Sequence, residues 1–117
     1  ITPFFLYFTI KCNLNKKYDI DKISTYYQNT ITYISENLKL IEWDKLDEIG
    51  QVRSANPYIN SNKMYYYEIL INGKGSIKLL RYEYDKISHK RVPIRLTLTF
   101  DIFKRLVDDL CDGLMIN

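Results

Sequence analysis

Residues 64–85, MYYYEILINGKGSIKLLRYEYD, decide the fold. Two runs rich in tyrosine, isoleucine and leucine flank the residues Asn72, Gly73, Lys74 and Gly75. Asparagine and glycine between two β-prone runs are typical of a tight hairpin turn. The stretch therefore predicts two long antiparallel strands that form the centre of a sheet.

The two faces of this hairpin differ in character. The odd-numbered positions from 65 to 71 carry no charge, so we expect that face to line the core. A two-residue turn would set Ile69 opposite Ser76. A three-residue turn would set Ile69 opposite Ile77 and Glu68 opposite Lys78. We predict the second register, because it matches apolar with apolar side chains and pairs opposite charges.

The segments before the hairpin predict a strand and two helices. Alternate apolar positions indicate a strand over residues 2–12. Apolar residues at spacings of three and four predict the longest helix, over residues 19–41, with Asp19 at its N-terminal end. A shared apolar side predicts a short helical segment over residues 42–51, and a polar loop follows it.

The segment after the hairpin predicts a strand and a helix. Residues 91–100 alternate between apolar and polar side chains. Pro93 lacks an N–H group, which favours the start of a strand or the edge of the sheet. Asp101 can cap a closing helix, and Gly113 is a plausible end for it.

These elements predict an α+β fold. We expect residues 1–117 to form a single domain with one antiparallel sheet of about four strands. A long helix near the N-terminus and a C-terminal helix would pack on this sheet. At 117 residues such a domain buries roughly 65% of its unfolded surface, which is enough for a core without metal or disulfides.

Composition narrows the classes of function. The chain is 46% apolar and 26% charged, as expected of a globular protein, and its net charge of +3 is too small to argue for nucleic acid alone. The two cysteines, Cys12 and Cys111, have no metal-binding spacing and indicate a reducing compartment, although a disulfide between them is an alternative. The apolar start of the chain lacks the basic leader and cleavage site of a signal peptide. No run is long enough to span a membrane, so we predict a cytoplasmic protein.

The chain offers little for catalysis. His89 is the single histidine, and no cysteine or ordered Ser–Asp pair lies near it in the sequence. The turn from Asn72 to Gly75 lacks the spacing and the following helix of a phosphate-binding loop. We therefore predict no enzymatic activity, no cofactor and no metal site.

Two charged segments are candidate binding surfaces. Acidic residues close to a tyrosine-rich strand could dock on the basic cleft of a partner protein. This first candidate interface consists of Glu42, Asp44, Asp47, Glu48 and Tyr66. The region 86–105 could instead grip a nucleic-acid backbone while nearby tyrosines stack on bases. This alternative surface consists of Lys86, Lys90, Arg91 and Arg95.

Taken whole, the chain resembles the small immunity proteins that bacteria pair with toxins, and among them the immunity partners of contact-dependent growth-inhibition toxins. The resemblance rests on the size of the α+β domain, on tyrosine- and asparagine-rich passages such as KMYYYE at residues 63–68, and on the lack of a catalytic set. It implies a non-enzymatic protein that binds and blocks a cognate toxin, often a nuclease. A small nucleic-acid-binding regulator is the alternative.

Overall fold

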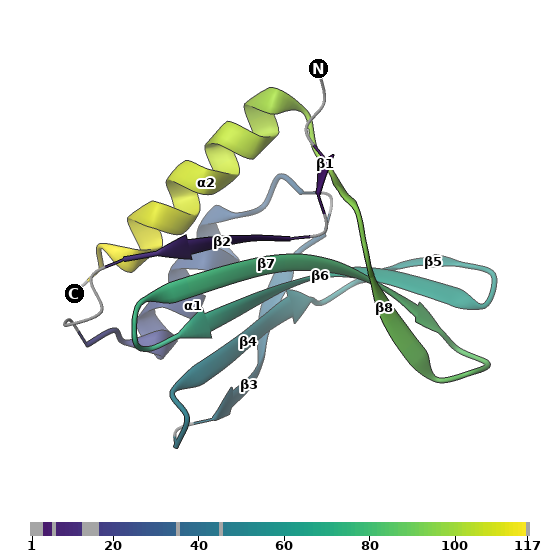
Figure 1. Cartoon of the computed structure of the whole chain (residues 1–117), viewed down its shortest axis with the longest axis horizontal. Helices are drawn as coiled ribbons and strands as arrows, with labels where there is room; N and C mark the ends of the chain where they lie inside the picture. Colours follow the sequence, from purple (N-terminus) through teal and green to yellow (C-terminus); the bar gives the residue numbers. More distant parts are fainter. Residues whose placement is uncertain (1–3, 6, 13–16, 35, 45, 117) are drawn as a thin grey trace.

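The computed structural model describes residues 4–5, 7–12, 17–34, 36–44 and 46–116. Its longest strands are β6 (Lys63–Asn72) and β7 (Ser76–Asp85), which pair as an antiparallel hairpin. The hairpin predicted from residues 64–85 is therefore confirmed. It lies in the middle of a larger sheet, to which every other strand except two short ones is joined (Figure 1).

The predicted register of the hairpin is wrong by two residues. Strand β6 continues through Asn72, and the turn takes the three residues that follow. Ile69 therefore faces Leu79 rather than Ile77. Because side chains alternate with a period of two, this shift leaves the same residues on each face. Gly75 has a φ of 108°, a backbone conformation that glycine adopts without steric cost.

The main sheet has seven antiparallel strands among the described residues, so the expectation of about four is wrong. The central order is β2-β7-β6-β4-β3, with β5 added beside β6 and β8 beside β7. The five strands that join the hairpin are β2 (Tyr7–Lys11), β3 (Leu38–Asp44), β4 (Ile49–Ser54), β5 (Tyr58–Asn60) and β8 (Lys90–Ile94). Two short strands, β1 (Phe4–Phe5) and β9 (Leu96–Thr97), pair separately.

Two of the added strands replace the short helix predicted over residues 42–51. This segment is the β3–β4 hairpin. Asp44 Oδ1 accepts hydrogen bonds from the backbone N–H groups of Leu46 and Asp47, at 3.0 and 3.1 Å, and closes the turn. An aspartate that bonds to the backbone two and three residues later favours a turn over a helix.

The order of helix lengths is also the reverse of the prediction. Helix α1 (Ile20–Thr30) has 11 residues, whereas α2 (Phe100–Leu114) has 15. Most of the apolar residues that suggested a helix to position 41 are buried, but Ile31 and Ile34 lie in an irregular segment and Leu38 begins β3. Ile41, the last of them, lies on β3 and is exposed. Their spacing reflects a chain that crosses the core beyond the end of α1.

The caps explain where the two helices begin. Asp19 caps α1 as predicted, since its carboxylate accepts from the N–H of Lys22 at 3.2 Å. Helix α2 is capped by Thr99 rather than by Asp101, because the Thr99 hydroxyl accepts from the N–H of Ile102 at 3.2 Å. The strand predicted over residues 91–100 is split at Arg95 into β8 and β9.

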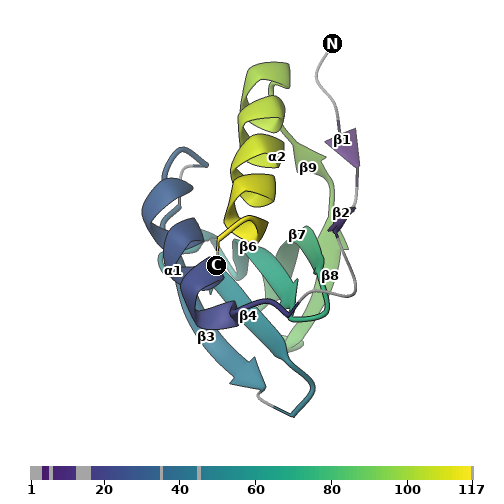
Figure 2. The same ribbon diagram turned by 90° about the vertical axis from the view of Figure 1, so that its left-hand side faces the viewer.

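Both helices lie on one side of the sheet (Figure 2). The uncharged face of β6 lines the core under them, as predicted. Tyr27 of α1 is fully buried, and its hydroxyl donates to the backbone carbonyl of Leu110 in α2 at 2.6 Å. Gly113 does not end α2 but lies inside it, and a Cβ atom there would be 2.8 Å from Tyr27 Cζ. Glycine at 113 therefore allows the two helices to approach closely.

The long strand pair extends beyond the helices. Its half near the turn is flanked by β2 and β4, whereas the other half is flanked by β5 and β8. We call this second half, with β5, β8 and the β7–β8 turn, the arm. Figure 1 shows the arm to the side of α1 and α2, so both of its faces lack a helix.

Candidate binding surface

The face of the sheet away from the helices carries a buried carboxylate. Glu68, near the middle of β6, is only 1% exposed although no helix covers it. Its Oε2 accepts from Arg53 Nε at 3.3 Å, from Arg53 Nη2 at 3.1 Å and from Arg91 Nη1 at 3.0 Å. The residue opposite Glu68 on β7 is Leu80, not Lys78 as predicted. Its charge partners come from β4 and β8 instead.

Two tyrosines hold these arginines in place. The Arg91 guanidinium lies over the ring of Tyr82 at 4.0 Å, and Arg53 lies over the ring of Tyr66 at 4.9 Å. The Tyr66 hydroxyl accepts from Arg91 Nη1 at 3.2 Å, and the two tyrosine rings are 5.6 Å apart. We call these five residues, including Glu68, the Glu68 cluster. Stacking of arginine on an aromatic ring adds to the ion pair and fixes the guanidinium plane.

The cluster affects the pKa values of Tyr82 and Arg91. Burial raises the pKa of Tyr82, the positive charge of Arg91 opposes that rise, and the Glu68 carboxylate adds to it. Burial alone would lower the pKa of Arg91, but its hydrogen bond to Tyr66 and the charge of Glu68 raise that pKa above its ordinary value. The Tyr82 phenol is therefore neutral, and the Arg91 guanidinium is charged, at physiological pH.

A pocket of ≈ 480 Å³ lies beside the cluster. It is lined by Arg53, Met64, Tyr66, Tyr84, His89 and Arg91. The Tyr84 hydroxyl is 3.0 Å from His89 Nδ1, so these two side chains form one wall. The sequence placed Arg53 in or near a loop, and Met64 was not predicted to line a site. Tyr84 was expected only as one of the tyrosines, with Tyr82, that could stack on bases beside the basic region. Four strands and the β7–β8 turn contribute to this pocket, which explains why local spacing did not predict it.

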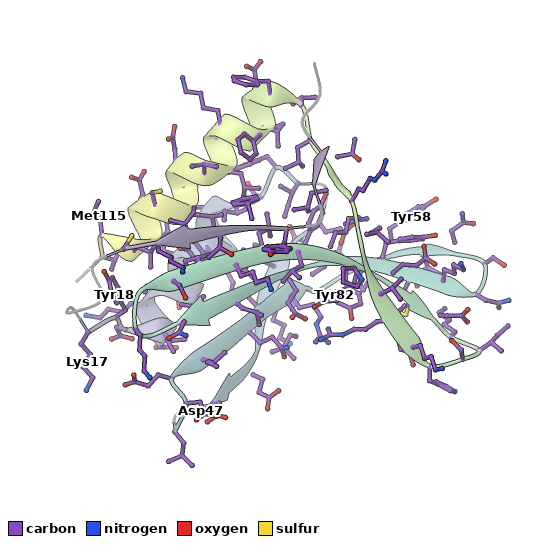
Figure 3. The ribbon with its side chains drawn as sticks, in the orientation of Figure 1. Lys17, Tyr18, Asp47, Tyr58, Tyr82 and Met115 are labelled. Atoms are coloured by element: carbon purple, nitrogen blue, oxygen red, sulfur yellow. The ribbon has the colours of Figure 1, made fainter. Side chains whose placement is uncertain are left out.

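The predicted acidic interface is divided by the structure. Glu42 and Asp44 lie on β3, and Asp47 and Glu48 lie in the turn that follows. Figure 3 shows Asp47 at the tip of this hairpin, away from Tyr82. The fifth member, Tyr66, is buried in the Glu68 cluster. The structure therefore does not bring the acidic residues and Tyr66 together.

Two of the acidic residues, Asp44 and Glu48, stabilise the β3–β4 turn. Asp44 closes the β3–β4 turn, and Glu48 has a φ of 55°, in the left-handed region. The Glu48 carbonyl accepts from the N–H of Gly73 at 2.7 Å, which ties this turn to the β6–β7 turn. Glu42 and Asp47 are exposed. A shallow hollow of ≈ 170 Å³ lies along the same hairpin and is lined by Glu42, Asp44, Ile49, Gln51 and Leu70.

The predicted basic surface is also divided. Arg91 belongs to the Glu68 cluster, and Lys90 directly precedes it in the same strand. Consecutive side chains of a strand point to opposite faces, so Lys90 and Arg91 do not share a surface. Lys86 lies in the β7–β8 turn and Arg95 lies between β8 and β9. The four residues do not form one continuous basic face.

Asp85 organises the turn that carries His89. Its Oδ1 accepts from the backbone N–H groups of Ile87 and Ser88, at 2.8 and 3.3 Å, and these bonds lower the pKa of the carboxyl below 3.8. A carboxyl whose folded pKa is lowered stabilises the turn above its unfolded pKa, and this contribution is lost as the pH falls through the folded pKa. In an NMR titration, the Ile87 and Ser88 amide signals should move with a midpoint below 3.8. The Asp85→Asn variant should abolish that step, and a midpoint at or above 3.8 would contradict the prediction.

Searches against protein-family models, curated proteins and solved structures found no match for this chain. Within the described ranges, neither helix is long and apolar enough to cross a membrane. The same residues contain no group of three or more histidine, cysteine, aspartate or glutamate side chains that could hold a metal ion. Cys12 and Cys111 are free thiols, and burial raises the pKa of Cys111.

Proposed function

We propose that this chain is a non-enzymatic immunity protein that binds and neutralises a cognate bacterial toxin of the nuclease class in the cytoplasm of the producing cell. The observation that supports this proposal is the character of the sheet face away from the helices. That face is open, and it combines arginine–tyrosine stacks with an adjacent acidic hairpin. Tyrosine and arginine are enriched among the residues that contribute most to protein–protein binding.

The two ends of this face differ in charge. The β3–β4 hairpin presents the exposed carboxylates of Glu42 and Asp47, whereas the other end presents Arg53 of β4 and Arg91 of the arm. A surface with both signs of charge complements a partner that also carries both. The proposal therefore does not require the strongly acidic composition of a pure nucleic-acid mimic, which this chain with its net charge of +3 does not have.

The proposal is tested by co-purification. Tagged protein from the source cell is captured together with the product of the gene immediately upstream, and growth is measured in cells that express that product. We expect a tight one-to-one complex and rescue of growth. Failure of both binding and rescue would overturn the immunity proposal. Recovery of RNA or DNA that is released at moderate salt would favour the nucleic-acid alternative.

Charge reversal tests the acidic end of the face. The variant Glu42→Lys with Asp47→Lys should weaken the complex about tenfold or more, because each lysine would meet a basic group of the partner. Asp44 is left intact because its carboxylate closes the turn. The control variant Asp108→Lys with Asp112→Lys makes the same charge change at exposed positions of α2. Equal affinities for the two variants would remove the hairpin from the interface.

A further inference from the structure

The Glu68 cluster carries more positive than negative charge. Two guanidinium groups, which stay protonated in proteins, share a single carboxylate. The hydrogen bonds of Arg53 use Nε and Nη2, and those of Arg91 use Nη1. The remaining N–H groups of both arginines have no hydrogen-bond partner in the part of the chain that the structure describes. Both side chains line the pocket and are 30% and 39% exposed.

These free donors are already oriented. Arg53 and Arg91 are each held by an ion pair with Glu68 and by stacking on a tyrosine ring. Groups held in place before binding lose less conformational entropy when a ligand arrives. A carboxylate in the pocket would accept charge-assisted hydrogen bonds from N–H groups that do not have to rearrange. It would also bring the charge of the cluster to zero.

The walls of the pocket define the kind of anion. Met64, Tyr66 and Tyr84 supply apolar surface that suits the short aliphatic stem of an aspartate or glutamate. A nucleic-acid backbone would need several cationic contacts in a row, and here the Glu68 carboxylate lies between the two arginines. The nearby Lys63 is paired with Glu83 at 2.7 Å. The pocket therefore favours one carboxylate over a chain of phosphates.

We infer that this pocket binds an acidic side chain of a partner protein, with the carboxylate held between Arg53 and Arg91. The inference rests on the proposed function, because it assigns the chemistry of the partner at the arm end of the same face. Removal of an acidic partner residue that contacts two oriented arginines in a pocket would strongly weaken the complex.

A direct test needs no toxin. A blocked six-residue peptide of glutamate and serine is titrated into the labelled protein while the arginine Nε–H signals are followed by NMR. The control peptide has glutamine in place of glutamate. We expect the acidic peptide to shift the signals of Arg53 and Arg91 saturably and the control peptide to leave them unchanged. Shifts confined to exposed lysines, or no saturation, would overturn the inference.

A pair of variants separates charge from shape. Met64→Glu places a carboxylate at the pocket, and Met64→Gln places an uncharged side chain of the same size there. Like charges at one site repel, so Met64→Glu should bind the acidic peptide about tenfold or more weakly than Met64→Gln. Equal affinities would show that no carboxylate enters the pocket. Thermal unfolding of both variants verifies that they are folded.

Two further experiments distinguish a carboxylate site from a nucleic-acid site, and the pocket inference from the proposed function. A six-nucleotide thymidine strand that shifts the same two arginine signals at lower concentration than the peptide, at about 0.15 M salt, would overturn the inference in favour of nucleic acid. If the protein captures and neutralises the toxin but does not bind the acidic peptide, the proposed function is supported. The inference that the pocket binds a carboxylate is then wrong. If the protein binds the acidic peptide but captures no toxin, the inference about the pocket is supported and the proposed function is wrong.

Discussion

Replacement of both Arg53 and Arg91 with glutamine is expected to lower the free energy of unfolding at pH 7 by about 3–5 kcal/mol. The reason is that Glu68 is 1% exposed and its described charge partners are these two arginines. Without them, a carboxylate stays buried with no compensating charge. Urea denaturation of the variant and of the wild-type protein measures the difference.

The matched control is Arg105→Gln. The Arg105 guanidinium also lies 4.0 Å from the centre of a tyrosine ring, that of Tyr33, but no described ion pair joins it to a buried carboxylate. We expect Arg105→Gln to cost less than about 1 kcal/mol. Glu68→Gln should fall between the two, because both arginines reach water and keep part of their hydration. A cost for the double variant equal to that of Arg105→Gln would contradict the central role of Glu68.

Replacement of Gly113 with alanine is expected to lower the free energy of unfolding by about 1–3 kcal/mol. At an exposed helix position the same change would raise stability by about 0.5–1 kcal/mol, because alanine restricts the unfolded chain and favours the helix. At position 113 the added methyl group would instead overlap the ring of Tyr27 and lie 3.0 Å from its hydroxyl. The two helices would have to separate, and the hydrogen bond from Tyr27 to Leu110 would lengthen.

Whether Gly113→Ala lowers or raises the free energy of unfolding decides whether the two helices are in close contact. Urea denaturation of Gly113→Ala should show a lower midpoint, and tyrosine absorbance should report a more exposed Tyr27. A second variant, Asp112→Ala, changes the exposed neighbour in the same helix and should shift stability by no more than about 0.5 kcal/mol. A stabilised Gly113→Ala protein would show that the helices are not in close contact at this point.

The elements that local chemistry determines were predictable from the sequence. The β6–β7 hairpin follows from its turn residues and β-prone runs, and the Asp19 cap follows from the preference of aspartate for the first position of a helix. The general α+β class also agrees with the structure. These features depend on a few consecutive residues, so tertiary contacts did not override them.

The errors arose where tertiary packing decides the conformation. Ile31, Ile34 and Leu38 continue a helical spacing, but Ile31 and Ile34 are buried in an irregular segment and Leu38 is buried at the start of β3. The periodicity of apolar residues cannot distinguish these two cases over one or two turns. The strand count failed because β3 and β4 were predicted as part of two helices, and because β5 (Tyr58–Asn60) lies in the segment predicted as a polar loop. The turn signal was present in Asp44, whose side chain bonds to the next residues of the chain.

The candidate site was predicted only in part. Arg91 was named as a candidate nucleic-acid contact and Tyr66 as a candidate protein contact, whereas the structure joins them through one hydrogen bond. Glu68 was a usable signal, because a charged residue within a strongly apolar strand requires a charge partner if it is buried. The identity of that partner was not predictable, since Arg53 lies in another strand and Arg91 in a third.

The arm has a consequence for the motions of the protein. Its strands are covered by no helix, so its backbone hydrogen bonds can open without disturbing the half of β6 and β7 that lies under α1 and α2. Amide hydrogens in the arm should therefore exchange with solvent faster than those near the β6–β7 turn. The pocket spans both halves, because Arg53 lies on β4 while Tyr84, His89 and Arg91 belong to the arm. A ligand held there would link the arm to the half of the sheet under the helices, and we expect it to slow exchange across the whole arm.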